Sequence, residues 1–338
     1  MRLERKASIL FLICVALYLG LSTVIALFYA RLTDDLQFLM SSLFVSVPAF
    51  LIPALFFRRR NALPAFKAPK FGHIMIAAAI GLGCVYMNEA LTFFNNIIYS
   101  GIELHSNTTT AETILELNPL VMILSLGILP PLCEEFIMRG TLLESWRRIS
   151  PIGAAILTSA LFALLHIAPS GFMIYFCIGM LLALVYLITR NVWMTVTIHL
   201  VNNFASVYSA LLTRFIAARS GISPAEALNE AQNGLMDYLP PELMNVGMLI
   251  ATSLMAAAIL VPMMLLLKGI FKRNKLGMYE EQPLEELVTA GIVTCDAAEI
   301  TEEKKPSLMA DPVLIVTLVI LIVLNILMGL FEFGVIKS

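Results

Sequence analysis

Two adjacent glutamates, Glu134 and Glu135, lie with Arg139 inside a stretch, residues 119–146, that is otherwise apolar and long enough to cross a bilayer. An ionisable side chain at bilayer depth costs at least about 2.5–3.5 kcal/mol on insertion scales, and more when lipid surrounds it. Three such groups so close together require partners or a water-filled cavity. Because ionisable groups inside a membrane usually serve function, this cluster is our starting hypothesis for a site.

Helix geometry separates the three charges. At 100° per residue, Arg139 lies about 40° from Glu135 but about 140° from Glu134 around the helix axis. We therefore predict a structural ion pair between Glu135 and Arg139, which leaves Glu134 unpaired. Pro130 and Pro131 lack an amide N–H. They are predicted to interrupt the helical hydrogen-bond ladder just before the glutamates.

Two further apolar segments carry a histidine with a partner four residues away. Phe162 and His166 share one helix face, and so do His199 and Asn203. With Glu134, these groups suit the hydrolysis of an amide bond. Glu134 would take a proton from water, and His166 would position that water or protonate the leaving amine. His199 and Asn203 would donate hydrogen bonds to the tetrahedral oxyanion.

A metal site would use the same atoms. One glutamate and two histidines form a common catalytic zinc set, so Glu134, His166 and His199 are the candidate ligands of a zinc-dependent enzyme. The usual HExxH motif is absent, and the five cysteines show no metal-ligand spacing. Cys133 adjoins Glu134 but points about 100° away, so it is a poor nucleophile. From the residues alone, a site without metal or cofactor and a zinc site both remain open.

The three motifs resemble those of the CPBP (Abi) family of intramembrane proteases, which includes the type II CAAX prenyl endopeptidases. The family motifs EExxxR, FxxxH and HxxxN stand here, in that order, as Glu134-Glu135-x-x-x-Arg139, Phe162-x-x-x-His166 and His199-x-x-x-Asn203. The resemblance covers residues 115–210 and implies a helical intramembrane endopeptidase.

The same resemblance implies a role for each motif residue. Glu134 and His166 would activate the hydrolytic water, and His199 and Asn203 would form the oxyanion site. The remaining motif residues would support these four: Glu135, Arg139 and Phe162. A glutamate-activated water without metal is the mechanism that the family resemblance favours.

The composition is that of a polytopic membrane protein. Of 338 residues, 59% are hydrophobic and only 14% are charged, whereas a soluble domain has about 25% charged residues. The net charge of −2 gives no basic field that would indicate a nucleic-acid partner. We predict an all-α polytopic membrane protein, a bundle of eight core transmembrane helices plus a detached C-terminal ninth. The apolar runs are 8–30, 37–57, 73–95, 119–146, 152–168, 171–189, 192–213, 245–271 and 312–334.

Lysine and arginine fall mainly in alternate loops, which by the positive-inside rule places the N-terminus in the cytoplasm. We predict a multi-pass protein of the cell (plasma) membrane. A capping box at Ser223–Glu226 predicts a short helix in an external loop. The predicted regions are an N-terminal three-span region (1–114), a catalytic core of spans four to seven (115–213), the external loop with its short helix (214–244), the eighth span (245–271), an acidic cytoplasmic linker (272–311) and the C-terminal span (312–338).

The predicted partners are the lipid bilayer and a membrane-associated protein or peptide substrate, including lipidated, CAAX-like chains. The sequence predicts neither the substrate's identity nor the oligomeric state. Two other functional classes compete with the protease. A non-catalytic scaffold or bacteriocin self-immunity protein would keep the polar cluster for helix packing. A transporter would show internal repeats, and none is visible.

Overall fold

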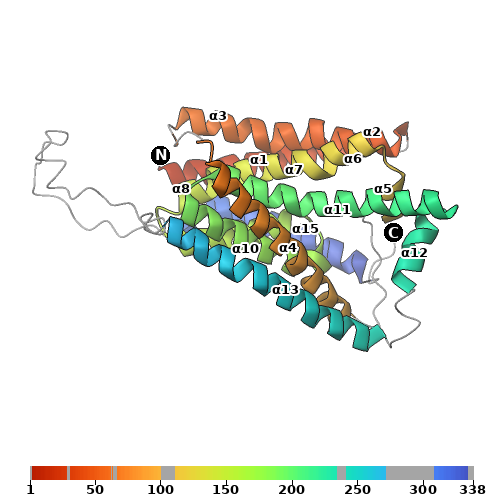
Figure 1. Cartoon of the computed structure of the whole chain (residues 1–338). Coiled ribbons are helices and arrows are strands. Elements are labelled where there is room, and N and C mark those ends of the chain that lie inside the picture. Colours follow the sequence, from red (N-terminus) through yellow and green to blue (C-terminus); the bar gives the residue numbers. More distant parts are fainter. Residues whose placement is uncertain are drawn as a thin grey trace, which may run out of the picture.

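The computed structural model describes residues 2–28, 31–61, 63, 67–99, 111–233, 241–271 and 308–333. Within these ranges every regular element is a helix and there is no strand, which confirms the predicted all-α class. Most of the predicted acidic linker, up to residue 307, lies outside the described residues. Figure 1 shows the helices gathered into one bundle, with α5 and α12 at the end opposite the N-terminus.

The N-terminal region contains three long helical stretches. The first is α1 (Leu3–Ala26). The second runs without a break through α2 (Asp34–Met40), the π-helix η2 (Ser41–Leu51) and α3 (Ile52–Arg60). The third is α4 (Phe71–Ile98), which packs against both α11 and α13.

The stretch that carries Glu134 and Glu135 stays helical through its two prolines. After α5 (Ala111–Glu116) it consists of α6 (Pro119–Met122), π-helix η3 (Ile123–Ile128), α7 (Leu129–Ile137), π-helix η4 (Met138–Leu143) and α8 (Glu144–Trp146). Pro130 and Pro131 fall in the first turn of α7, where a missing N–H costs least. The predicted interruption therefore takes the form of a widened π turn. π turns inside helices occur mostly at functional sites.

A short hairpin follows, made of α9 (Pro151–Leu165), the 3₁₀ turn η5 (Pro169–Gly171) and α10 (Phe172–Thr189). Ser150 caps α9 by accepting a hydrogen bond from the amide of Gly153 at 3.1 Å. Gly179 lets the two helices approach closely, because a Cβ there would lie 3.1 Å from Cα of Ser159. At 1.5 Å per residue α9 is about 22 Å long, which is shorter than the roughly 30 Å hydrocarbon layer.

The remaining helices are α11 (Val192–Ser220), α12 (Pro224–Asn233), α13 (Pro241–Ile270), the turn η6 (Leu308–Ala310) and α15 (Pro312–Glu332). The predicted capping box opens α12. The amide of Ser223 donates to Glu226 at 2.7 Å, and the amide of Glu226 donates to Ser223 Oγ at 3.2 Å. The predicted short helix is confirmed.

Seven helices of the described chain are long and apolar enough to cross a membrane: Leu3–Ala26, Asp34–Arg60, Phe71–Ile98, Pro119–Trp146, Pro169–Thr189, Leu243–Ile270 and Pro312–Glu332. The other two predicted spans are helices that do not meet this standard. The apolar helix Pro151–Leu165 is too short. The helix α11 carries His199, Asn202 and Asn203 in its middle, which lowers its hydropathy.

The last helix, α15, is not detached, so this part of the prediction is wrong. It packs against α1, α9 and η5. Leu314, Leu321 and Asn325 are buried in these contacts. The sequence before α15 is long and polar, and such a segment does not determine where the following helix packs. The sequence pattern therefore could not predict these contacts.

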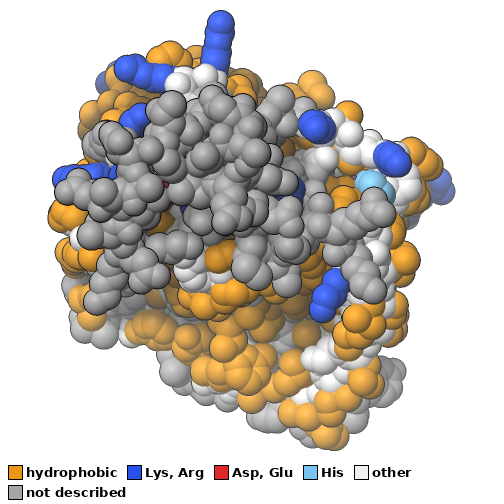
Figure 2. Space-filling view, turned by 90° about the vertical axis from the view of Figure 1, so that its left-hand side faces the viewer, with side chains coloured by type: hydrophobic (Ala, Val, Ile, Leu, Met, Phe, Trp, Pro, Cys, Tyr) orange, Lys and Arg blue, Asp and Glu red, His pale blue; other side chains and the backbone are white. Residues whose placement is uncertain are grey.

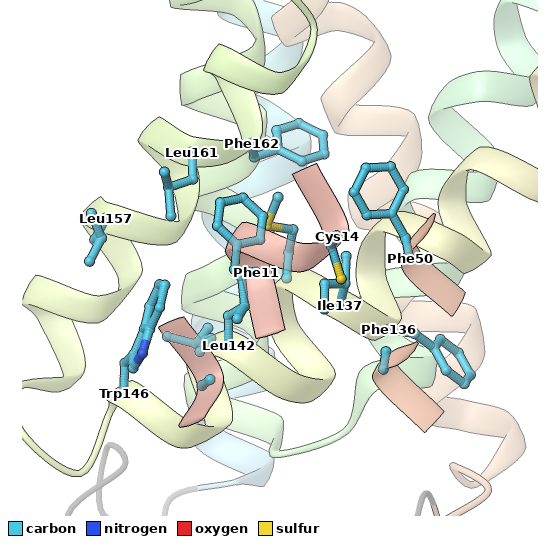
Figure 3. Close-up of a cluster of buried hydrophobic side chains, with 14 of the residues drawn as sticks. Phe11, Cys14, Phe50, Phe136, Ile137, Leu142, Trp146, Leu157, Leu161 and Phe162 are labelled. Atoms are coloured by element: carbon cyan, nitrogen blue, oxygen red, sulfur yellow. The ribbon is translucent and has the colours of Figure 1, made fainter. Parts of the chain in front are cut away.

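One large apolar cluster joins α1, η2, α7, η4, α8 and α9. Figure 3 shows Phe11 of α1 in the middle of this cluster, with Leu142 and Trp146 on one side and Phe162 and Phe50 on the other. Phe11 and Trp146 are fully buried. The cluster holds the glutamate-bearing stretch between α1 and α9. Figure 2 shows several Lys and Arg side chains on the end of the bundle where α3 and α8 finish.

Candidate active site

The predicted ion pair forms inside the bundle. Arg139 Nη1 donates to Glu135 Oε1 at 2.9 Å, and both side chains are fully buried. Arg139 Nη2 donates to the carbonyl oxygen of Gly179 on α10, also at 2.9 Å. Because an unpaired buried charge is strongly destabilising, this pair fixes α7 and η4 against α10.

His199 of α11 lies between the two glutamates. Its Nδ1 is 3.1 Å from Glu135 Oε1, and its Nε2 is 3.8 Å from Glu134 Oε2. A carboxylate that already accepts from Arg139 can only accept again, so His199 Nδ1 is the donor in this bond. Glu135 thereby orients the imidazole and directs Nε2 towards Glu134.

Glu134 differs from Glu135 in its access to a cavity. Both keep a buried Oε2 without a hydrogen-bond partner among the described residues, but the Glu134 side chain is 25% exposed and lines a cavity, whereas Glu135 is fully buried. Nε2 of His199, at 3.8 Å, is beyond hydrogen-bond distance. A buried acceptor without a partner costs free energy and is rare in native structures, so it indicates a site that accepts a hydrogen bond from another molecule.

His166 is the residue that follows α9, at its C-cap, and it lines the same cavity as Glu134. The cavity has a volume of about 170 Å³. Its lining includes Tyr18 from α1, and Ser46 and Phe50 from η2. The ring of His166 stacks on Tyr175 of α10 with 3.8 Å between centroids. Sequence analysis missed both tyrosines, because no spacing rule connects them to the motifs.

The tautomer of His166 follows from its own helix. Its Nδ1 lies 2.8 Å from the carbonyl oxygen of Phe162, and a carbonyl only accepts, so Nδ1 carries the hydrogen. In the neutral imidazole Nε2 is then an acceptor, free to hold a water. The ring of Phe162 lies edge-on to both histidines, 4.8 Å from His166 and 5.9 Å from His199, and under the guanidinium of Arg139 at 4.8 Å.

Asn203 has a structural task that the sequence prediction did not include. Its Nδ2 donates to the carbonyl oxygen of Leu126 at 3.0 Å. In a helix that oxygen would accept from residue 130, or from residue 131 in a π turn, and both are prolines without an N–H. Asn203 therefore supplies the hydrogen bond that the proline pair removes. One hydrogen of its amide remains for another acceptor.

Residues 116–205 match the family model described as Rce1-like, type II CAAX prenyl endopeptidase. This segment is similar to the Rce1-like family. No curated protein and no solved structure gives a significant match to the chain. The Rce1-like segment contains all seven predicted site residues and stops short of α12, α13 and α15.

The Rce1-like segment also contains a second charged cluster, which sequence analysis missed. Glu144 accepts from Nε and Nη2 of Arg147 at 3.1 and 2.9 Å, from the hydroxyl of Tyr186 at 2.8 Å, and from Nη2 of Arg190. The i,i+3 spacing of Glu144 and Arg147 was the available signal. Arg190 lies just beyond α10, and burial lowers the pKa of its guanidinium although Glu144 opposes that shift.

A larger cavity of about 410 Å³ lies on another side of α11, between α4, α5 and η3. Asn88 Nδ2 donates to Asn202 Oδ1 at 2.9 Å beside it, and Glu89 is exposed in its wall. None of the seven predicted site residues lines this cavity. It adjoins the candidate site through Leu126, whose carbonyl binds Asn203.

The zinc alternative needs Glu134, His166 and His199 around one point. Among the described residues, no three His, Cys, Asp or Glu side chains are grouped so that they could hold a metal ion. Nδ1 of each histidine binds Glu135 or the carbonyl of Phe162, which leaves Nε2 as the only ring nitrogen that could bind a metal. As they are arranged, the three side chains are not grouped as a zinc site.

Proposed function

We propose that this protein is an intramembrane endopeptidase that hydrolyses a peptide bond of a membrane-associated protein with a water activated by Glu134. One observation carries the proposal. The buried Oε2 of Glu134 has no partner in the described chain, lies 3.8 Å from His199 Nε2, and belongs to a side chain that shares a cavity with His166. The match of residues 116–205 to the Rce1-like family supports the same reading.

In the proposed reaction Glu134 is the general base. The water oxygen forms a bond to the carbonyl carbon of the substrate while one water proton passes to Glu134. His166 Nε2 accepts a hydrogen bond from the same water and so orients it. When the C–N bond breaks, the proton on Glu134 moves to the leaving amine, which returns the carboxylate to its starting state.

His199 is the proposed oxyanion donor. In this role His199 donates from both ring nitrogens, from Nδ1 to Glu135 and from Nε2, on the side of Glu134, to the oxyanion. The remaining amide hydrogen of Asn203 is the proposed second donor. No step in this scheme uses a metal.

The proposed substrates are membrane-associated chains of the CAAX class, lipidated or not. We further propose that the basic end in Figure 2 faces the cytoplasm of a plasma membrane, with the N-terminus on that side. Three of the arginines at this end, Arg58, Arg59 and Arg60, form the last turn of α3. Two others, Arg147 and Arg190, are paired with Glu144.

The test uses purified full-length protein in proteoliposomes, with a farnesylated CAAX-type peptide and the same peptide without the lipid. We expect wild type to cleave at least one of the two. Glu134→Ala and His166→Ala should reduce the rate about 10²–10⁴-fold, the size of a lost acid–base group. Glu89→Ala, which removes an exposed carboxylate outside the site, is the matched control and should leave the rate unchanged.

Cleavage retained in Glu134→Ala would overturn the proposal. A metal analysis with chelator treatment separates the two chemistries, because only a zinc enzyme loses activity with its metal. A non-catalytic scaffold or immunity protein predicts instead that Glu134→Gln, which preserves shape, keeps the biological phenotype.

A further inference from the structure

The turn that carries His166 is under backbone strain. α9 ends at Leu165, and Ile167 has a φ of +47°, in the left-handed region. A β-branched residue rarely adopts this conformation, which costs free energy and persists only where surrounding structure determines it. Residues 166–171 therefore need contacts from neighbouring elements to hold this turn.

One support reaches the end of α9 from the last helix. Asn325 Nδ2 of α15 donates to the carbonyl oxygen of Leu164 at 2.8 Å. That oxygen also accepts from the amide of Ile167 at 3.2 Å. The last carbonyls of a helix lack intrahelical donors. Asn325 supplies one, two residues before His166, and it is buried while doing so.

A second support reaches the other end of the turn. Glu332 Oε2 accepts from the amide of Ser170, and its Oε1 accepts from the hydroxyl of the same residue, both at 3.1 Å. On the opposite side Asn95 Nδ2 of α4 donates to the carbonyl oxygen of Ser170 at 2.7 Å. Ser170 is thus bound from two helices that are distant in sequence.

The helix that makes these bonds has no other evident task at the site. α15 lies outside residues 116–205, and none of its residues lines the cavity of Glu134 and His166. Its buried face, with Leu314 and Leu321, belongs to the same apolar cluster as α1 and α9. Its two polar contacts with the hairpin fall one on each side of Ile167.

We infer that α15 positions His166 through the bonds of Asn325 to Leu164 and of Glu332 to Ser170, and we call this pair of contacts the latch. Asn325 and Glu332 are positioning residues: they hold the strained turn at residues 166–171, and the turn holds the imidazole against Tyr175 and the cavity. The inference rests on the proposed function, in which His166 orients the water. It assigns to the C-terminal helix a part in catalysis without any contact with substrate.

Two measurements on the full chain test the latch. The first is backbone hydrogen exchange of residues 164–171, which does not depend on knowing the substrate. The second is the cleavage of the proteoliposome substrate, divided into kcat and KM. The variants are Asn325→Leu, Glu332→Leu and the conservative Glu332→Gln. Thr317→Val is the matched control, because Thr317 is fully buried on α15 and, among the described residues, its hydroxyl bonds only its own helix, at Val313.

Asn325→Leu and Glu332→Leu should raise exchange across residues 164–171 about tenfold, since local opening loses a stabilising bond. They should lower kcat about tenfold with KM unchanged, the pattern of a lost transition-state contribution. Glu332→Gln keeps one acceptor for Ser170 and should recover most of both values. Thr317→Val should change neither.

Each contrary outcome has a separate meaning. Unchanged exchange in both leucine variants overturns the latch, whatever the protein cleaves. Raised exchange with an unchanged kcat overturns the positioning of His166. If wild type cleaves nothing, the proposed function fails, while the exchange result still decides whether α15 holds the turn.

Discussion

Two buried carboxylate clusters lie ten residues apart on the same helical stretch, and they differ in how completely they are paired. Both oxygens of Glu144 accept hydrogen bonds, from Arg147, Arg190 and Tyr186, and its side chain is only 1% exposed. Glu134 keeps one buried oxygen without a partner in the described chain and opens into a cavity. The first arrangement leaves nothing for a substrate or a water to bind, and the second does.

Glu135 combines a structural ion pair, as at Glu144, with a role in the candidate site. It is fully buried and paired with Arg139, as Glu144 is paired with Arg147, yet it also orients His199 towards Glu134. The comparison teaches that burial of a charge does not by itself mark a reactive group. A carboxylate oxygen left open on a cavity beside oriented histidines does, and the neighbouring ion pairs make that arrangement stable.

The largest expected effect on stability is at Glu144. Glu144→Leu would leave Arg147 and Arg190 without the carboxylate that binds both, so we expect a loss of about 3–5 kcal/mol in the free energy of unfolding. Thermal unfolding in detergent measures it. A stability equal to wild type would show that this cluster is not the structural one.

A smaller loss of stability, with a loss of activity, is expected at Glu135. Glu135→Gln keeps a hydrogen-bond acceptor but leaves Arg139 without a counter-charge, so about 1–3 kcal/mol should be lost. The double variant Glu135→Gln/Arg139→Met should recover stability, because the uncompensated charge is gone. It should not recover cleavage, since His199 still lacks its carboxylate partner. Recovery of both would reduce Glu135 to a packing residue.

The smallest effect is expected at a carboxylate outside the membrane. The amide of Ser223 donates to Glu226 and lowers the pKa of that carboxyl below its ordinary value of 4.5. A depressed folded pKa stabilises the capping box above pH 4.5, and that contribution disappears as the pH falls through the lowered value. Hydrogen exchange of residues 223–227 should therefore rise on acidification. Glu226→Ala should show the raised exchange already at pH 7, with cleavage unchanged.

The sequence predicted the parts of the site that depend on helical periodicity. The pairing of Glu135 with Arg139 and the open state of Glu134 follow from angles around one helix. The capping box at Ser223 likewise depends on local spacing alone. The three motifs were found from residue types and i,i+4 spacing and match the motifs of the family that the chain resembles. In the structure His199 Nε2 lies 3.8 Å from Glu134, and His166 lines the same cavity as Glu134.

The parts that were missed depend on contacts between distant segments. No periodicity connects Glu144 with Arg190, or Asn325 with Leu164, so these bonds become visible only in the folded chain. The same holds for Asn203, whose bond to Leu126 exists because two prolines remove the donors of that carbonyl's own helix. The docking of α15 was mispredicted for this reason as well.

The most direct test of the central claim compares Glu134→Gln with Glu144→Gln in one preparation, by thermal unfolding and by cleavage per folded molecule. We predict that Glu134→Gln unfolds within about 2 °C of wild type and cleaves at least about 100-fold more slowly. Glu144→Gln should unfold at a lower temperature, while its folded molecules cleave within about threefold of the wild-type rate. A Glu134→Gln protein that cleaves at the wild-type rate would contradict the claim that Glu134 is the reactive carboxylate.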